Sequence, residues 1–563
     1  MSLIEALRNF ARSAGRRIGQ CYRSATRRIP SAADRRWTLS AEETAAYLRT
    51  EAPDCLQEDF VDDRTWSDLE MEKIYARFDR CITPMGAQYL YALLRTYQTN
   101  PESLKANVQI CHAFKTNPQA TVAVQCALRE LGRQESANLA EILLGAPAAS
   151  PEPRQLFYLI SAASVACPLG LIVSPWFLLP CLSLWVANIF LHYFYGKEVL
   201  RHSPALTSLA ILLNCVPQVS HALDGLGAPE REELQKLTGI AKRTQKQVSR
   251  VFLGKNEIND LVIVVIEYLN VLCLFELCAM SRAIVAVNRD RSALIKIFRI
   301  VARLDAMQGI SSALAEYPLT CVPELKAGRS FMIVDVYHPL LNNPVCNTIE
   351  GTGQSLLLSG TNMAGKTTFI KTLALNLLLS QSIGQCLARK AVLPPARVRT
   401  LIEREDKITS GQSYFFFEAS ELLRMLNDGQ RSGREHWFVL DEIFRGTNAV
   451  ERVAAGRAVL SYLARHGVVI ASTHDHELTN LLREEFDMYH FSEVIDGNEA
   501  RFDYLLQKGP CTTRNAIRLL VLAGYPKEVT DLAGKLTTPA NLDGMSAGDR
   551  TLRTKEAGAS PCI

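Results

Sequence analysis

Hydrophobic and polar positions follow a helical spacing over most of the N-terminal half of the chain. Residues 40–150 and 197–325 carry apolar side chains three and four positions apart, which predicts amphipathic helices. From residue 355 the pattern changes to short apolar runs between turns, which is typical of buried strands that alternate with helices. The sequence therefore predicts an α-helical core domain in two segments, followed by an α/β domain over residues 326–540.

An uncharged stretch separates the two helical segments. Residues 155–196 contain no Lys, Arg, Asp or Glu, and this length is about twice the ~20 apolar residues that one spanning helix needs. Prolines interrupt the stretch near its middle, at Pro168, Pro175 and Pro180. We predict a transmembrane hairpin of two helices, over residues 156–174 and 177–195. Arg154 and Lys197 flank the hairpin, so the positive-inside rule places both of its ends in the cytoplasm.

Two alternatives stay open for the membrane assignment. The uncharged stretch could form a buried helical pair in a soluble domain. A second apolar stretch, residues 261–275, is interrupted by Glu267. Because a charge at the centre of a bilayer is costly, this second stretch favours a buried helix over a third span.

The C-terminal domain contains a candidate phosphate-binding loop. Residues 360–367 fit G-x-x-x-x-G-K-[ST], between a predicted strand at 355–359 and a predicted helix at 368–375. In such a loop, backbone N–H groups surround phosphate oxygens, the lysine reaches the β- and γ-phosphates, and the last hydroxyl ligates Mg²⁺. The predicted ATP-binding residues are Gly360, Thr361, Asn362, Met363, Ala364, Gly365, Lys366, Thr367 and Thr368.

Two further predicted strands end in side chains that suit nucleotide hydrolysis. One apolar strand ends in Asp441 and Glu442. Asp441 can hold Mg²⁺ together with Thr367, and Glu442 can orient or deprotonate the attacking water. The other strand ends at His474, which can reach the γ-phosphate and report its presence. Solvated acids and a structural histidine are the alternatives for these positions taken singly.

These motifs together resemble the ATPase domain of the MutS family over roughly residues 330–535. The resemblance rests on the phosphate loop, Asp441-Glu442-Ile443, Arg445-Gly446-Thr447-Asn448, Ser472-Thr473-His474 and residues 410–418. It implies an α/β P-loop ATPase domain of ABC type that works as a homodimer. It also implies that Ser413 acts in trans on the partner's γ-phosphate and that His338 lies beside the adenine. Phe444 stands where the family commonly has glycine.

The helical segments resemble the core domain of the same family. Thr83-Pro84-Met85-Gly86 matches a Thr-x-x-Gly step before a long helix, and Leu304-Asp305 matches the segment that closes the core. A generic helix bundle is the alternative. Residues 1–60 are too short for the family's mismatch-reading domain, so we expect no direct mismatch recognition. DNA stays a candidate partner through backbone contacts.

Composition adds limits but no partner. The net charge of +4 over 563 residues does not by itself indicate nucleic acid. The 15 cysteines include no C-x-x-C pair, which disfavours a zinc site and indicates reduced thiols in a cytosolic setting. Residues 1–39 are arginine-rich, typical of a basic amphipathic helix, a transit peptide or a solvated tail. Residues 541–563 are predicted to be disordered.

The leading hypothesis is a membrane-anchored MutS-like ATPase whose ATP-driven closure moves the helical domain and acts on DNA or a membrane partner. The second hypothesis is a membrane-associated scaffold whose assembly is set by nucleotide, with no role on DNA. An ABC transporter is a weaker reading, because the sequence lacks a Leu-Ser-Gly-Gly-Gln type signature and two spans are few for a transport path.

Overall fold

The computed structural model describes residues 47–48, 59–98, 100–129, 131–133, 139–147, 154–226, 230–249, 268–360, 365–402, 414–431, 435–496, 499–511, 520–521 and 524–536. The chain divides into a helical unit that ends at Val322 and an α/β unit that begins at Pro323. Two short segments are exceptions, since Ser67–Leu69 belong to the α/β unit and Leu378–Gln385 to the helical unit. The predicted order, a helical region followed by an α/β domain, is confirmed.

The helical unit is organised around α13 (Phe275–Leu314), against which several other helices pack. The other α-helices in the described part of this unit are α3 (Asp63–Asp68), α4 (Met71–Phe78), α5 (Pro84–Arg95), α6 (Pro101–Thr116), α7 (Pro118–Leu128), α8 (Leu139–Leu144), α9 (Arg154–Ala166), α10 (Leu178–Ala222) and α11 (Glu230–Val248). The starts of α5, α6 and α7 share one device: a Thr or Asn side chain accepts a backbone N–H, and proline follows at the first helical position. Such caps satisfy N–H groups that the helix itself leaves without partners.

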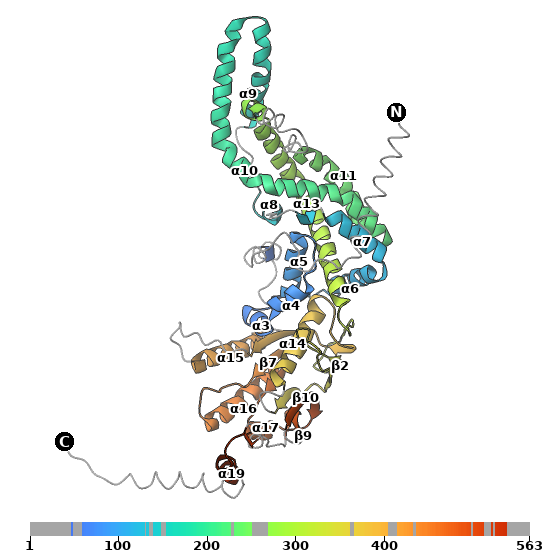
Figure 1. Ribbon diagram of the computed structural model, residues 1–563, viewed down its shortest axis with the longest axis vertical. Helices are drawn as coiled ribbons and strands as arrows, with labels where there is room; N and C mark the ends of the chain where they lie inside the picture. Colours follow the sequence, from blue (N-terminus) through green and yellow to red (C-terminus); the bar gives the residue numbers. More distant parts are fainter. Residues whose placement is uncertain are drawn as a thin grey trace, which may run out of the picture. The chain divides into compact units, whose positions relative to one another are not determined.

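The two predicted helices are present and form a hairpin, but the second helix does not end near residue 195. The first arm is α9 with the 3₁₀ segment η4 (Cys167–Ile172), and the second arm begins at η5 (Pro175–Phe177) and continues as α10 to Ala222. The sequence prediction placed the end of this helix where the apolar run stops. Charged residues that follow are good helix formers, so they end the apolar surface without ending the helix. Figure 1 shows α10 leaving the hairpin, bending, and running on beside α11 and α13.

Three stretches in the described part of the chain are long and apolar enough to cross a membrane. Arg154–Ile172 and Pro175–Tyr195 form the hairpin, and their most apolar windows are only 17% and 11% buried. The third stretch, Ser203–Gly225, is 56% buried because α10 packs there against α7, α11 and α13. The hairpin arms therefore expose most of their apolar surface, whereas more than half of the third stretch is buried by neighbouring helices. Residues 261–267 of the second apolar stretch lie outside the described residues.

The α/β unit contains two mixed sheets. The larger has the order β10-β9-β4-β8-β7-β6, with β10 antiparallel at one edge and the other neighbouring pairs parallel. Its strands are β4 (Ser355–Ser359), β6 (Ala396–Leu401), β7 (Glu435–Asp441), β8 (Val468–Ser472), β9 (Phe486–Asp496) and β10 (Glu499–Lys508). The smaller sheet has the order β1-β5-β2-β3 and comprises β1 (Glu324–Leu325), β2 (Phe331–Val336), β3 (Asn347–Gly351) and β5 (Lys390–Leu393).

Parallel pairing places the polar ends of three strands at one edge of the larger sheet. β4 and β8 are buried along their whole length, which explains why they read as continuous apolar runs. The helices that the structure describes beside these strands are α14 (Lys366–Ser382), whose last residues belong to the helical unit, α15 (Tyr414–Arg431), α16 (Ala449–His466), α17 (His476–Leu481) and α19 (Lys527–Leu536). Ligands of open α/β sheets bind outside the carboxyl ends of the strands. The residues at and after the carboxyl ends of β4, β7 and β8 are therefore expected to form the ligand site.

Candidate nucleotide site

Two glycines bound the candidate phosphate loop, and both need the backbone freedom of glycine. Gly360 and Gly365 have φ values of 130° and 96°, a region that side chains with a Cβ rarely adopt. A Cβ on Gly360 would lie 2.6 Å from the carbonyl oxygen of Phe491, so the space is also closed. Residues Thr361, Asn362, Met363 and Ala364 lie outside the described part of the chain. Their predicted role therefore stays a prediction.

Lys366 is the first residue of α14 and is almost completely buried. Its Nζ lies 2.5 Å from the carbonyl oxygen of Gly360 and 3.8 Å from Oε1 of Glu442. Burial lowers the pKa of Lys366 to about 8, although the charge of Asp441 opposes this shift. A buried ammonium group is held at a site only where negative charge or hydrogen-bond acceptors meet it. The lysine is thus placed to meet an anion at this edge of the sheet.

Thr367 and Asp441 come together from α14 and β7. The Thr367 hydroxyl donates a hydrogen bond to Oδ2 of Asp441 at 2.7 Å. The hydroxyl of Ser472, at the end of β8, donates to the other carboxylate oxygen of Asp441. Hydroxyl and carboxylate oxygens are the hard ligands that Mg²⁺ prefers, usually with further ligands from phosphates and water. The donor set at Thr367 and Asp441 therefore fits a magnesium ion.

Ser472 is a site residue that the sequence analysis named within a motif but gave no role. β7 and β8 are parallel neighbours, and Asp441 pairs with Ser472 in their register. Adjacent parallel strands bring residues at matched positions to the same edge of a sheet. The sequence did contain this signal, because both predicted strands end in polar residues. Using it would have required knowing that the two strands are neighbours.

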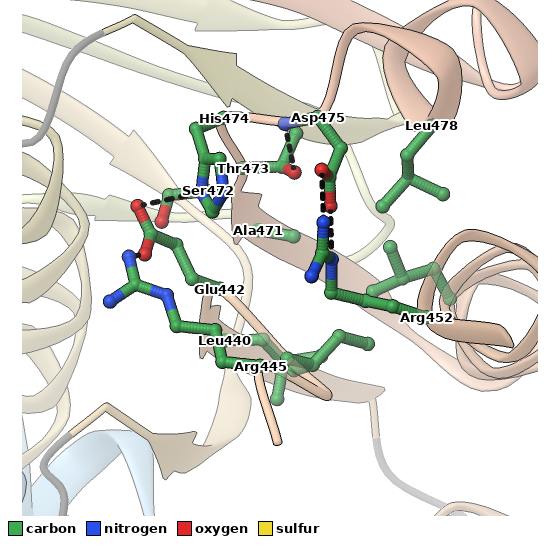
Figure 2. Close-up of a pocket in the computed structure, with 12 residues that line it drawn as sticks. Leu440, Glu442, Arg445, Arg452, Ala471, Ser472, Thr473, His474, Asp475 and Leu478 are labelled. Carbon is green, nitrogen blue, oxygen red and sulfur yellow. Dashed lines mark hydrogen bonds and ion pairs between the residues drawn. The ribbon is translucent and has the colours of Figure 1, made fainter. Parts of the chain in front are cut away.

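Glu442 follows β7 and is buried, with a left-handed φ of 51°. Its backbone N–H donates to the carbonyl oxygen of Ser472 at 3.1 Å. This bond holds the turn after β7 against the end of β8. Its Oε1 lies 3.5 Å from Nδ1 of His474, and its other carboxylate oxygen contacts Arg445. Figure 2 shows the side chains of Glu442 and His474, which both line a pocket, turned toward each other. Two of the three predicted catalytic side chains, Glu442 and His474, are thus brought together.

The turn that carries His474 is fixed by an ion pair that the sequence analysis missed. Arg452 of α16 donates two hydrogen bonds to the carboxylate of Asp475, at 2.8 and 2.9 Å (Figure 2). The backbone N–H of Asp475 also donates to the Thr473 hydroxyl at 3.0 Å. These residues line the pocket together with Glu442, Arg445, Ser472 and His474. No local pattern pairs Arg452 with Asp475, because 23 residues separate them.

The other predicted residues lie in different places. His338 follows β2 and is buried, and its Nδ1 accepts the backbone N–H of Leu340 at 3.3 Å. Thr368 lies in the first turn of α14, where its carbonyl oxygen accepts the Thr372 hydroxyl. Ser413 lies outside the described residues. Contact of His338 with adenine and the action of Ser413 in trans therefore stay predictions.

The site belongs to an α/β domain in which polar residues at the ends of β7 and β8 converge beside the start of α14. Residues 356–540 match the family model described as MutS domain V. The chain is similar to the DNA mismatch repair protein MutS of Natronomonas pharaonis, with 30% identity over 263 residues. It is also similar to the DNA mismatch repair protein MutS of Chloroflexus aurantiacus, with 33% identity over 262 residues. The similarity to MutS proteins therefore lies in the C-terminal half of the chain, with residues 356–540 resembling MutS domain V.

The matches cover only part of this chain and only part of each relative. They include 45% and 43% of this chain, but only 29% and 26% of the Natronomonas and Chloroflexus proteins. The chain thus matches less than a third of the length of these relatives. The shared part is the region that holds the candidate nucleotide site.

Proposed function

We propose that this chain is a membrane-anchored ATPase of the MutS family that binds ATP with Mg²⁺ and hydrolyses it in a homodimer. The observation that carries the proposal is the hydrogen bond of 2.7 Å between Thr367 and Asp441, with Lys366 and Glu442 alongside. The match to MutS domain V supports the same reading.

Each side chain at the site has a role in this proposal. Lys366 attracts the β- and γ-phosphates, because its ammonium group is buried at the end of β4. Mg²⁺ held by Thr367 and Asp441 would supply positive charge to the phosphate oxygens. Glu442 orients the attacking water and accepts its proton. His474 lies within 3.5 Å of Glu442, so a γ-phosphate that contacts His474 is also sensed at the carboxylate.

The hairpin supports the membrane part of the proposal. Its tip exposes large apolar side chains, with Ile172 and Val173 at 84% and Trp176 at 80% exposure. Residues 178–195 of α10 rise about 27 Å, close to the ~30 Å hydrocarbon core of a bilayer. An exposed apolar surface of this length is stabilised by lipid. The flanking positive charges favour a cytoplasmic position for the α/β unit.

The test is ATP turnover by the full chain purified in detergent, comparing the natural protein with Glu442→Gln. We expect Mg²⁺-dependent turnover that Glu442→Gln lowers by about 100-fold or more, with ATP binding retained. Glu477→Gln is the matched control, because Glu477 is an exposed glutamate on α17. Turnover unchanged in Glu442→Gln would contradict the role of Glu442. ATP binding without any turnover by the natural protein would favour a nucleotide-regulated scaffold.

The DNA part of the proposal rests on the printed names of the relatives and needs its own arm. Turnover is measured with homoduplex, mismatched and branched DNA at stated salt, because nucleic-acid affinity depends strongly on ionic strength. Stimulation by one of these DNAs supports a role on DNA. Equal turnover with every DNA would point to a membrane or protein partner.

A further inference from the structure

The turn after β7 contains two residues in a backbone conformation that side chains disfavour. Glu442 and Phe444 have φ values of 51° and 61°, and they flank Ile443. In this left-handed region the Cβ crowds the following carbonyl group, so non-glycine residues occupy it only when neighbours hold them there. The turn that presents Glu442 therefore depends on contacts from outside itself.

One of these contacts comes from Glu418 on α15. The backbone N–H of Phe444 donates to Oε1 of Glu418 at 2.7 Å, and the Glu418 side chain is only 3% exposed. A carboxylate acceptor makes this a charge-assisted hydrogen bond, about twice as strong as a neutral one. Removing a carboxylate from water is costly. An apolar residue would fill this position more readily if packing were its only purpose.

The side chain of Phe444 is held by the same helix. It belongs to one buried cluster with Leu422 and Met425 of α15, and its ring lies 5.8 Å from the ring of Phe415. α15 thus contacts the turn in two ways: Glu418 accepts a hydrogen bond from the backbone of Phe444, and apolar side chains of the helix pack against the Phe444 ring. The same helix begins at Tyr414, directly after Ser413.

We propose that Glu418 is a positioning residue, which holds the Phe444 turn so that the Glu442 carboxylate stays beside Lys366 and His474. This inference rests on the proposed ATPase function. It gives a role to Glu418, a residue to which the sequence motifs assign none. Glu418 touches no reacting atom and acts through the backbone of Phe444. Its loss should therefore impair the hydrolytic step more than nucleotide binding.

The test compares four versions of the full chain in detergent: the natural protein, Glu418→Ala, Glu418→Gln and the control Glu421→Ala on the same helix. We expect Glu418→Ala to lower kcat by about tenfold or more, with KM and ATP affinity within about threefold, since small displacements of a catalytic group have large effects. Glu418→Gln keeps an oxygen acceptor and should retain at least about a third of kcat. Natural kcat in Glu418→Ala would overturn the proposal, as would equal losses in kcat and ATP affinity.

A second variant guards against misfolding of Glu418→Ala. Glu418→Asp keeps the charge but withdraws the carboxylate by about 1.5 Å, so kcat should fall with KM unchanged. Natural kcat in this variant would count against the positioning role. Turnover of the natural protein is measured first, because its absence defeats the proposed function rather than this inference.

Hydrogen exchange distinguishes a failure of the proposed ATPase function from a failure of the inference about Glu418. The amide of Phe444 is the donor to Glu418, so exchange in the segment 441–448 should quicken in Glu418→Ala and stay unchanged in Glu421→Ala. This readout needs no ATP. Unchanged exchange in Glu418→Ala would overturn the inference even if the natural protein hydrolyses ATP.

Discussion

The carboxylate of Asp305 binds both the backbone N–H and the hydroxyl of Thr83, at 2.8 and 2.6 Å, across 222 residues of chain. Asp305 lies on α13, and Thr83 caps α5. A Cβ at Gly86 would lie 2.3 Å from Oδ2 of Asp305, so the glycine makes room for the carboxylate. Two patterns noted separately in the sequence, Thr-x-x-Gly and Leu-Asp, are therefore the two sides of one buried contact.

Replacing Asp305 by alanine should destabilise the helical unit by about 2–4 kcal/mol, because the donors of Thr83 would lose their buried acceptor. The measurement is denaturant unfolding of the full chain in detergent. Asp224→Asn is the control, because Asp224 forms exposed ion pairs with His221 and Arg231, which contribute under about 1 kcal/mol. Equal stability of the two variants would show that the Asp305 contact contributes little.

Asp290 should make stability depend on acid pH. Hydrogen bonds from Arg289 hold the pKa of this carboxyl below its ordinary value, with help from Thr244 and Arg243 and against the effect of burial. A lowered pKa in the folded state adds stability above the unfolded pKa of about 4, and this stability is lost as pH falls further. Unfolding of Asp290→Asn should therefore approach that of the natural protein below about pH 4. A stability difference that stays constant from pH 7 to pH 3 would contradict this account.

The Thr367 hydroxyl should be needed for use of Mg²⁺. Thr367→Val removes the hydroxyl at nearly constant shape, so turnover at low Mg²⁺ should fall by about 100-fold, with partial recovery at high Mg²⁺. Thr367→Ser keeps the hydroxyl and should stay active, while a chelator should abolish turnover in each version. Thr372→Val is the control, because the Thr372 hydroxyl bonds only within α14, to the carbonyl oxygen of Thr368. Similar Mg²⁺ titrations for Thr367→Val and Thr372→Val would remove Thr367 from the magnesium site.

A charge on the exposed face of the hairpin should impair membrane integration. Val186 is 66% exposed in the hairpin part of α10, and an arginine near a bilayer centre costs about 3 kcal/mol by insertion measurements. Val186→Arg should therefore leave the carbonate-resistant membrane fraction. Gln235→Arg, on an exposed position of α11, should remain there. Equal retention of both variants would argue against the hairpin as the anchor.

The sequence revealed the parts of the fold that local patterns encode. β4, β7 and β8 are buried strands between polar ends, so their apolar runs identify them within about a residue. The extent of α10 was underestimated, because an apolar run reports the surroundings of a helix rather than its length. The left-handed φ of Phe444 explains why glycine suits that position, and only the backbone geometry reveals it.

Site contacts across long separations were beyond local patterns. The Arg452–Asp475 pair and the Glu418–Phe444 bond join different elements, and their partners follow from how α15 and α16 pack. Predictions for residues 1–39, 541–563, Ser413 and residues 361–364 fall outside the described part of the chain. The pairing of Asp441 with Ser472 follows from strand order, which an isolated strand pattern does not contain.

The continuity of α10 determines how the proposed anchor can move. One helix of 45 residues serves as the second arm of the hairpin and then as a packed helix of the core, with Pro204 inside it. A proline bends a helix but leaves it a stiff connection, unlike a Gly/Ser linker. The hairpin is thus connected rigidly to the helical unit and not through a flexible linker. In the proposed membrane-anchored state, rotation of the helical unit would tilt the hairpin in the lipid. Bilayer thickness and tension would then act mechanically on that unit.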